Sequence, residues 1–478
     1  MKKIIIALSL LSFIALAIIG CEDYSKITAP VVNTGTADFT TLVTVGNSLT
    51  AGYQSSSLFE SAQKYSFGNL LASHLKTSFE QPLYSDPGTQ GRLEIVTLEP
   101  FAFAANENSG VPLNIALPRP YNNLGIPGAL LFDVMNATNA NNCASAIFAG
   151  KPNPMFDLIL RNSALQIGTQ FQQASVLNPT FITLWIGNND VLGFATSGGT
   201  SPSTPTDVNT FAALYNATAG AFASLGAKVA VSNVFDVSTI PFFTTVGPQM
   251  ALEIPWGYLS SLGAPGVFYQ QHGEIIATGL ADSLKLLTGG IYITLPGGSY
   301  AGLIGAPTGK FYRDYGFPTI PPGIDTTKPF GVHPQNPWPD ALTLDEGEIS
   351  TVQSTVISYN NIIKDAADAN GFAYADANTL LKNFRANDFT GGTDINGINF
   401  KTIFVTGGLF GLDGVHPSNQ AQGILANEFI TAINAKFSAN IPLIDVSTIP
   451  GSLVFSELKL DKQGYPQFKK GAFDHLLF

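Results

Sequence analysis

The stretch that decides the fold is Thr41–Gly52, which reads T-L-V-T-V-G-N-S-L-T-A-G. Its apolar, β-branched part, Leu42–Val45, predicts a short buried strand. The strand breaks at Gly46, and the residues after Ser48 predict the opening of a helix. A serine at such a turn lies at the carboxyl edge of a sheet, near helix N–H groups that can stabilise an oxyanion. The stretch therefore fits a nucleophilic serine, or a simple helix cap made by Asn47 and Ser48.

Strand and helix patterns alternate along the rest of the chain. Buried strands are predicted at Thr180–Ile186, Lys228–Val234 and Phe372–Ala375. Helices are predicted at Ser61–Lys76, Leu158–Ala174, Thr206–Leu225, Thr343–Asn370 and Pro417–Phe437, and a loop is predicted at Asp133–Gly150. This alternation indicates parallel βαβ units and a layered α/β core.

Two long segments interrupt the alternation, at about 79–120 and 240–342, and both are rich in Pro. The second leaves the core after a predicted strand, at the sheet edge where ligands bind, and it carries many aromatic residues. We expect it to cap the Ser48 site; the alternative is a satellite unit packed on itself. One domain is predicted over 39–437, followed by an extension, 438–478, packed on the core.

Composition limits the class of protein. Of the 478 residues 45% are hydrophobic and only 12% are charged, and the formal net charge is -11. An acidic chain without basic clusters argues against nucleic-acid binding. With 47 Gly and 30 Pro, the chain is expected to contain many long ordered loops.

The N-terminus has the features of a targeting segment. Lys2 and Lys3 precede the apolar run Ile4–Ile19, which ends at Gly20-Cys21. This resembles a bacterial lipoprotein signal, which implies a signal peptide at 1–20, lipid on Cys21, a flexible tether at 21–38 and membrane attachment through the lipid. The two acids after Cys21 resemble export signals, which favours the outer membrane of the cell envelope. An ordinary signal peptide and a short membrane anchor are the alternatives.

The cysteine content argues against an intrachain disulfide and against a zinc site made of cysteines. The chain has 2 cysteines, Cys21 and Cys143. If Cys21 carries lipid, Cys143 has no partner for an intrachain disulfide. A cysteine zinc site is excluded too, and we expect no metal.

Three further motifs hold residues suited to catalysis. In Asp413-Gly414-Val415-His416, the spacing allows the carboxylate to bind imidazole Nδ1 and leave Nε2 free to take a serine proton. Asn189 follows a predicted buried strand, where its amide can donate to an oxyanion. Gly128 allows close approach of its backbone N–H to a substrate oxygen. Each motif alone also fits an ordinary turn or loop.

Together the four motifs resemble the SGNH hydrolase superfamily, also called GDSL lipases and esterases. The resemblance rests on Gly46–Leu49, the segment ending at Gly128, Gly187–Asp190 and Asp413–His416, in the family's order. It does not cover the long insertions. It implies a three-layer α/β/α sandwich with a mainly parallel, flavodoxin-like sheet.

The resemblance also implies a role for each residue. Ser48 would be the nucleophile, His416 the general base and acid, and Asp413 the orienting carboxylate. Ser48, Gly128 and Asn189 would form the oxyanion hole. Asn47 departs from the family's usual Asp, but it is not part of the triad. The α/β-hydrolase G-x-S-x-G elbow is absent.

The function expected from this resemblance is ester hydrolysis through an acyl-enzyme, without a cofactor. The aromatic-rich insertion favours an acyl lipid as the substrate. Aromatic side chains also stack on sugars, so deacetylation of an acylated glycan is an alternative. A non-catalytic surface binding lipoprotein is a second class.

Overall fold

The structure, a computed structural model, describes residues 32–98, 101–200, 203–261, 263–275, 277–451, 467–468, 471–474 and 476. The predicted signal peptide, Cys21 and the tether as far as residue 31 lie outside these residues. No helix in the described ranges is both long enough and apolar enough to cross a membrane.

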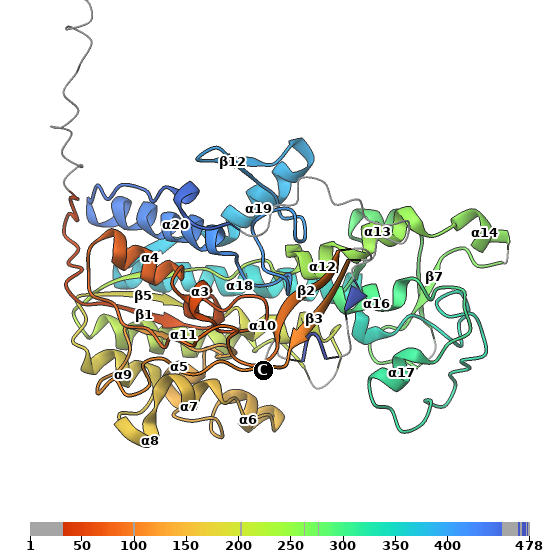
Figure 1. The fold of residues 1–478 in the computed structure, drawn as a ribbon, viewed down its shortest axis with the longest axis horizontal. Coiled ribbons are helices and arrows are strands. Elements are labelled where there is room, and N and C mark those ends of the chain that lie inside the picture. The colour runs from red at the N-terminus through yellow and green to blue at the C-terminus, as the bar shows by residue number, and fades with distance from the viewer. Residues whose placement is uncertain are drawn as a thin grey trace, which may run out of the picture.

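A five-stranded parallel sheet forms the centre of the molecule (Figure 1). Its strands are β1 (Leu42–Gly46), β4 (Asn123–Gly125), β5 (Phe181–Trp185), β6 (Lys228–Ser232) and β11 (Ala373–Ala375). They lie in the order β4-β1-β5-β6-β11, and every neighbouring pair is parallel. This is the flavodoxin-like order, in which ligands bind where the order reverses, here between the carboxyl ends of β1 and β5.

Helices cover both faces of the sheet, because its strands carry apolar side chains on both sides. On one face, Leu42 packs in an apolar cluster with α4 (Phe67–His74) and α20 (Asn419–Phe437). On the other, Val43 packs in a second, larger cluster, in which three helices lie against this face of the sheet. These are α9 (Gln170–Val176), α11 (Val208–Ala223) and α18 (Glu346–Asn370). The predicted three-layer α/β/α fold is therefore confirmed.

Two predicted helices are wrong, because each is broken. Ser66 interrupts the first: its side chain accepts a hydrogen bond from Asn69 N and begins α4 separately from α3 (Glu60–Gln63). The second is broken at Arg161 and Gln166, which both have positive φ. It forms α7 (Met155–Leu160), α8 (Asn162–Leu165) and α9.

The segment predicted as a loop at Asp133–Gly150 also differs from its prediction, since it contains two short helices. These are α5 (Asp133–Asn136) and α6 (Ala144–Ala149). Buried Asp133 links them, because its carboxylate accepts hydrogen bonds from Leu130 N and Ala144 N. Cys143, which precedes α6, is a buried free thiol.

The segment at about 79–120 contains an antiparallel hairpin of β2 (Arg92–Leu98) and β3 (Phe101–Asn106). The short strand β14 (Gln467–Phe468) pairs with β3 in parallel. The described end of the C-terminal extension therefore lies on this hairpin.

Both ends of the described core meet at the C-terminal end of α20. Thr36 N donates to Phe437 O at 2.9 Å, and Asn440 N donates to Asn33 O at 2.7 Å. Residues after α20 then run back along it, where Ile441 N donates to the Asn434 side chain. The folded body thus includes residues before the expected boundary at 39.

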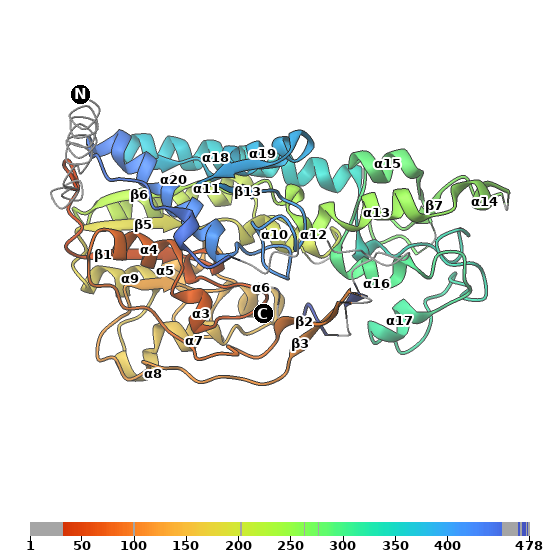
Figure 2. The same cartoon turned by 45° about the horizontal axis from the view of Figure 1, so that its top comes forward.

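The segment at about 240–342 forms a lobe that extends away from the central sheet in both views (Figures 1 and 2). Its helices are α12 (Pro241–Thr244), α13 (Val246–Glu253), α14 (Trp256–Ser261), α15 (Ser283–Thr288), α16 (Gly298–Ala301) and α17 (Lys310–Asp314). Its strands are β7 (Val267–Tyr269), β8 (Gly279–Ala281) and β9 (Tyr292–Ile293), the last paired with β10 (Thr343–Leu344). Apolar packing continues unbroken from the core into this lobe.

A smaller excursion follows β11. It contains α19 (Ala377–Asn387) and a hairpin of β12 (Thr393–Ile395) and β13 (Ile398–Phe400). Asn233, at the carboxyl end of β6, holds the start of this excursion by donating to Asp376 Oδ1 at 2.7 Å.

Candidate active site

Ser48 lies at the turn between β1 and the short helix α2 (Ser48–Ala51), as predicted. Asn47 caps α2 by accepting a hydrogen bond from Leu49 N at 3.1 Å, so the capping interpretation is correct for Asn47. Gly46 is required at the end of β1, because a Cβ there would lie 2.3 Å from both Thr50 Oγ1 and Trp185 O. Ser48 is thus held at the carboxyl end of the strand and is 4% exposed.

The predicted pairing of Asp413 with His416 is present. His416 Nδ1 lies 2.9 Å from Asp413 Oδ2, and both side chains are buried. Asp413 Oδ1 accepts hydrogen bonds from Val415 N and His416 N, each at 2.9 Å, which folds the four-residue loop around the carboxylate. With Nδ1 donating to the carboxylate, Nε2 is left as the basic nitrogen of the ring.

The segment that begins with Ser48 contacts both members of this pair. Tyr53 N donates to Ser48 O at 3.1 Å, and the Tyr53 ring packs edge-on against the His416 ring, with centroids 4.8 Å apart. Ser56 N donates to Asp413 Oδ2 at 2.7 Å. In the described part of the chain no hydrogen bond joins the Ser48 hydroxyl to His416, and Tyr53 contacts both residues. Sequence reasoning missed Tyr53 and Ser56, although their place just after Ser48 was a usable signal.

The electrostatic setting favours a charged Asp413 next to the imidazole. Burial would raise the pKa of Asp413, but the adjacent His416 and the hydrogen bonds from its ring and backbone outweigh burial and lower the pKa. Burial, reinforced by the Asp413 charge, raises the pKa of Tyr53 well above its ordinary value. Tyr53 therefore stays neutral against the His416 ring.

Gly128 and Asn189 lie next to each other. Asn189 begins α10 (Asn189–Thr196), after β5, and its Nδ2 donates to Ala129 O at 2.9 Å. Gly128 has φ +78°, a conformation that favours glycine. The segment before it is tied to the Ser48 turn, since Ile126 N donates to Gly46 O at 3.0 Å. Three of the four predicted motifs thus meet at the carboxyl ends of β1, β4 and β5.

The family comparison covers this part of the chain. Residues 42–271 match the family described as GDSL-like Lipase/Acylhydrolase. These residues belong to that family. The match supports ester hydrolysis in general, and the matched range holds Ser48, Gly128 and Asn189 but ends before Asp413 and His416.

Comparisons with other proteins add little to the GDSL-like assignment. The crystal structure of an alpha/beta hydrolase enzyme from the metagenome of Lake Arreo, Spain, is 10% identical, with a TM-score of 0.33. The match covers 83% of this chain and 96% of that one, and at this score it carries no argument. A comparison with curated proteins finds no significant match.

In the GDSL-like domain, Asp190 connects α10 to the segment that follows Gly128. Its carboxylate accepts hydrogen bonds from Leu131 N at 2.9 Å and from the Thr206 hydroxyl at 2.8 Å. Burial raises the pKa of Asp190 to about 7. Because Leu131 follows the Gly128 turn, Asp190 fixes that turn against the start of α10.

A cavity of about 620 Å³ lies between the β2–β3 hairpin and the Asp413 loop. Gln54 and Ser55, which follow the Ser48 turn, line one side, and Gly411 and Leu412, which precede Asp413, line another. Its remaining walls combine the apolar residues Phe59, Ile95 and Phe410 with the polar residues Arg92, Glu94 and Asn419. This volume lies within the usual range for small-molecule sites.

The loop that carries His416 is held from two sides. Phe242 N, at the base of the lobe, donates to Gly414 O at 3.0 Å. On the other side Ser418 caps α20 by accepting from Ala421 N, so Pro417 precedes the cap. The expectation that Pro417 opens the helix is therefore wrong, because the Ser418 hydroxyl provides the start signal.

Among the aromatic residues of the lobe, Phe242 at its base contacts the site loop through its backbone, and most of the others pack within the lobe. Phe311 packs against Tyr300, Tyr312 and Tyr315, and Phe330 packs against Trp338. All of these side chains except Tyr315, which is about half exposed, are buried inside the lobe. The base of the lobe therefore contacts the loop that carries His416, and most of its aromatic residues pack among themselves. The cap over Ser48 stays a prediction.

Proposed function

We propose that this protein is a serine esterase that cleaves carboxylic esters through an acyl-enzyme. Ser48 Oγ attacks the ester carbonyl carbon while His416 Nε2 takes its proton, and Asp413 stabilises the resulting imidazolium. The imidazolium then protonates the leaving alkoxide. Water, deprotonated by His416, attacks the acyl-Ser48 ester and releases the carboxylic acid.

The oxyanion formed in each step is stabilised by three donors: the N–H groups of Ser48 and Gly128 and the Nδ2 group of Asn189. Asn189 and Gly128 are both only partly buried, which suits groups that contact substrate. The bond from Asn189 Nδ2 to Ala129 O uses one amide hydrogen and leaves the other for the oxyanion. Such preorganised donors are among the largest contributions to acyl-transfer catalysis.

The observation that carries this proposal is the buried Asp413–His416 pair, whose ring packs on the segment that follows Ser48. It is tested by labelling with a fluorophosphonate. The wild type should be labelled at Ser48, and Ser48→Ala should lose both labelling and about 10⁶-fold in hydrolysis rate. Ser163→Ala, at an exposed serine on α8, is the matched control and should label normally. A wild type that resists labelling would favour the non-catalytic binding alternative.

For the substrate we propose an ester with an apolar acyl group that enters the cavity beside the Asp413 loop. Its support is the apolar part of the cavity wall, Phe59, Ile95 and Phe410. The polar part of the same wall, Arg92, Glu94 and Asn419, favours a second candidate, an O-acetylated glycan. A series of p-nitrophenyl esters from acetate to palmitate distinguishes the two. Rising kcat/KM with chain length supports the acyl lipid, and a preference for acetate supports the glycan.

We also propose that Cys21 carries the lipid that anchors this enzyme in the bacterial envelope, in the outer membrane. The support is the Gly20-Cys21 junction after a short apolar run. Cys21→Ser should move activity from the membrane fraction to the soluble fraction. Cofractionation of the variant with membranes would instead favour a spanning anchor.

A further inference from the structure

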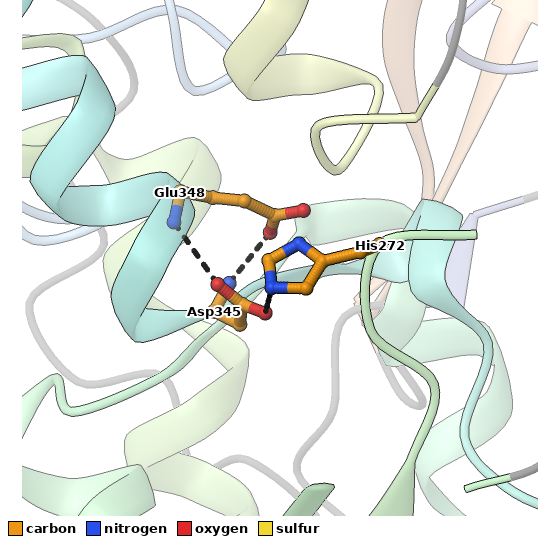
Figure 3. Close-up of side chains that lie close together, drawn as sticks. All are labelled: His272, Asp345 and Glu348. Atoms are coloured by element: carbon orange, nitrogen blue, oxygen red, sulfur yellow. Dashed lines mark hydrogen bonds and ion pairs between the residues drawn. The ribbon is translucent and has the colours of Figure 1, made fainter. Parts of the chain in front are cut away.

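His272, Asp345 and Glu348 form a cluster in which one potential ligand atom from each residue lies within 4.8 Å of the others. His272 belongs to the connection between β7 and β8 in the lobe. Asp345 is the N-cap residue of α18, and Glu348 lies in the first turn of that helix. Figure 3 shows the two carboxylates and the imidazole ring gathered together from these two parts of the chain.

Helix capping explains only some of the carboxylate oxygens in this cluster. Asp345 Oδ1 accepts from Glu348 N at 3.0 Å, and Glu348 Oε2 accepts from Asp345 N at 2.8 Å, which is a capping box. Asp345 Oδ2 accepts from Gln271 Nε2 at 2.9 Å and lies 3.7 Å from His272 Nε2. Glu348 Oε1 is buried without a hydrogen-bond partner, although Glu348 is only 4% exposed. A buried carboxylate oxygen without a donor requires another explanation.

A third carboxylate has the same property. Asp340 is 5% exposed; its Oδ2 accepts from Gly273 N at 2.7 Å, and its Oδ1 is buried without a partner. Gly273 directly follows His272, so Asp340 holds the same lobe segment.

No lysine or arginine neutralises these acids in the described part of the chain. His272 is the only ion-pair partner of Asp345 there, and Asp340 and Glu348 have none. Lys285, a nearby cation, pairs with Glu346 at 2.6 Å instead. Buried carboxylates without a cation are unfavourable, and a metal ion would supply the missing positive charge.

We propose that His272, Asp345 and Glu348 bind a divalent transition-metal ion such as Zn²⁺, with Asp340 as a further carboxylate beside it. One imidazole nitrogen with carboxylate oxygens is a donor set that suits Zn²⁺ or Mn²⁺ better than Ca²⁺ or Mg²⁺, which prefer oxygen alone. The ion would link the β7–β8 connection to the N-terminus of α18, the long helix of the core. Its role is structural: it fixes the lobe to the hydrolase domain. None of these residues belongs to the proposed catalytic site.

The test measures Zn²⁺ binding to the purified, metal-free full-length protein by titration calorimetry and thermal melting. We expect one Zn²⁺ per chain and a melting temperature that rises with Zn²⁺ concentration. Glu348→Gln keeps the capping box, which accepts Gln as well as Glu, and should weaken binding at least ~10-fold. His272→Ala removes an exposed side chain, so the variant should fold, and it should weaken binding by a similar factor.

His333→Ala is the matched control, because His333 is also in the lobe but outside the cluster. It should bind Zn²⁺ like the wild type. Mn²⁺ in place of Zn²⁺ identifies the preferred ion. The proposal is overturned if neither ion raises the melting temperature, or if Glu348→Gln and His272→Ala bind as tightly as His333→Ala.

Discussion

Among the residues that the structure describes, two histidine–aspartate pairs differ in almost every respect. In the GDSL-like core, His416 Nδ1 lies 2.9 Å from Asp413 Oδ2, and both side chains are buried. At the base of α18, His272 Nε2 lies 3.7 Å from Asp345 Oδ2, and the His272 side chain is 65% exposed. In the first pair, the Asp413 carboxylate accepts four hydrogen bonds. The second lies beside Glu348 and Asp340, each of which has one buried carboxylate oxygen without a donor.

This comparison shows that the surroundings, and not the residue types, decide what a histidine–aspartate pair can do. Around Asp413 the donors lower its pKa and fix the tautomer of His416, which suits proton transfer. Near Asp345, burial first, and then repulsion from the Asp345 and Asp340 carboxylates, raises the pKa of Glu348 to about 8. Excess buried negative charge suits a cation instead.

The largest expected effect is the loss of activity when Asp413 is replaced. Asp413→Asn keeps the shape of the side chain but lets the amide favour the wrong His416 tautomer. In serine enzymes with this arrangement, such a change lowers kcat by roughly 10⁴. Steady-state kinetics on a p-nitrophenyl ester measures the loss. A reduction of less than tenfold would show that Asp413 does not orient the base.

A smaller effect is expected at the other end of the site. Asn189→Ala should lower kcat by roughly 10² to 10³, the usual cost of one oxyanion donor, with little change in KM. Asn189→Asp, which keeps the shape but loses the donor, is the matched variant and should be at least as slow. If both variants change KM alone, Asn189 binds the substrate and does not stabilise the oxyanion.

Metal removal should affect the cluster around His272 and Asp345 and leave the chemistry at Ser48 unchanged. Treating the holoprotein with a chelator should lower its melting temperature by a few degrees, because an ion that binds only the folded state stabilises it. The rate of fluorophosphonate labelling at Ser48 should stay within about twofold, since Ser48 chemistry uses no metal. A parallel loss of labelling would show that the two sites are coupled.

A further expected effect concerns the pH dependence of stability. Because burial raises the pKa of Asp190 to about 7, the folded state prefers its protonated form. This contribution to stability is complete below about pH 4 and is lost as the pH rises through 7. Asp190→Asn removes the titration, so the wild type should lose stability relative to the variant between about pH 4 and 7. Parallel melting curves of the two proteins over this range would contradict the assignment.

The core could be predicted from sequence because its signals are local and continuous. The runs around Leu42, Phe181 and Lys228 are strands within about two residues of their predicted limits, since buried parallel strands are short and uniformly apolar. The ends of α18 and α20 were predicted within a few residues for a similar reason: both helices are long and periodic.

Other features depend on contacts that a periodic pattern does not show. Ser66 and Arg161 interrupt apolar periods that read as continuous helices, because a cap and a positive φ override the periodicity. The Asp345–Glu348 spacing was visible as a capping-box pattern, D-x-x-E, inside a predicted helix. The approach of His272 to Asp345 depends on the fold of the lobe, for which the sequence carries no regular pattern. The proposed roles of Ser48, His416 and Asn189 stay predictions.

The direction of α20 has a consequence for how the molecule would sit at a membrane. The helix starts at the loop of His416 and ends at Phe437, where Thr36 is hydrogen-bonded, about 28 Å away for 19 residues. The chain from Cys21 to Asn33 reaches at most about 40 Å. A lipid on Cys21 would attach the molecule at the amino edge of the sheet, opposite Ser48. Because this tether reaches farther than α20 is long, it would let the Ser48 edge turn either to the bilayer or to the medium, so esters from both would be within reach.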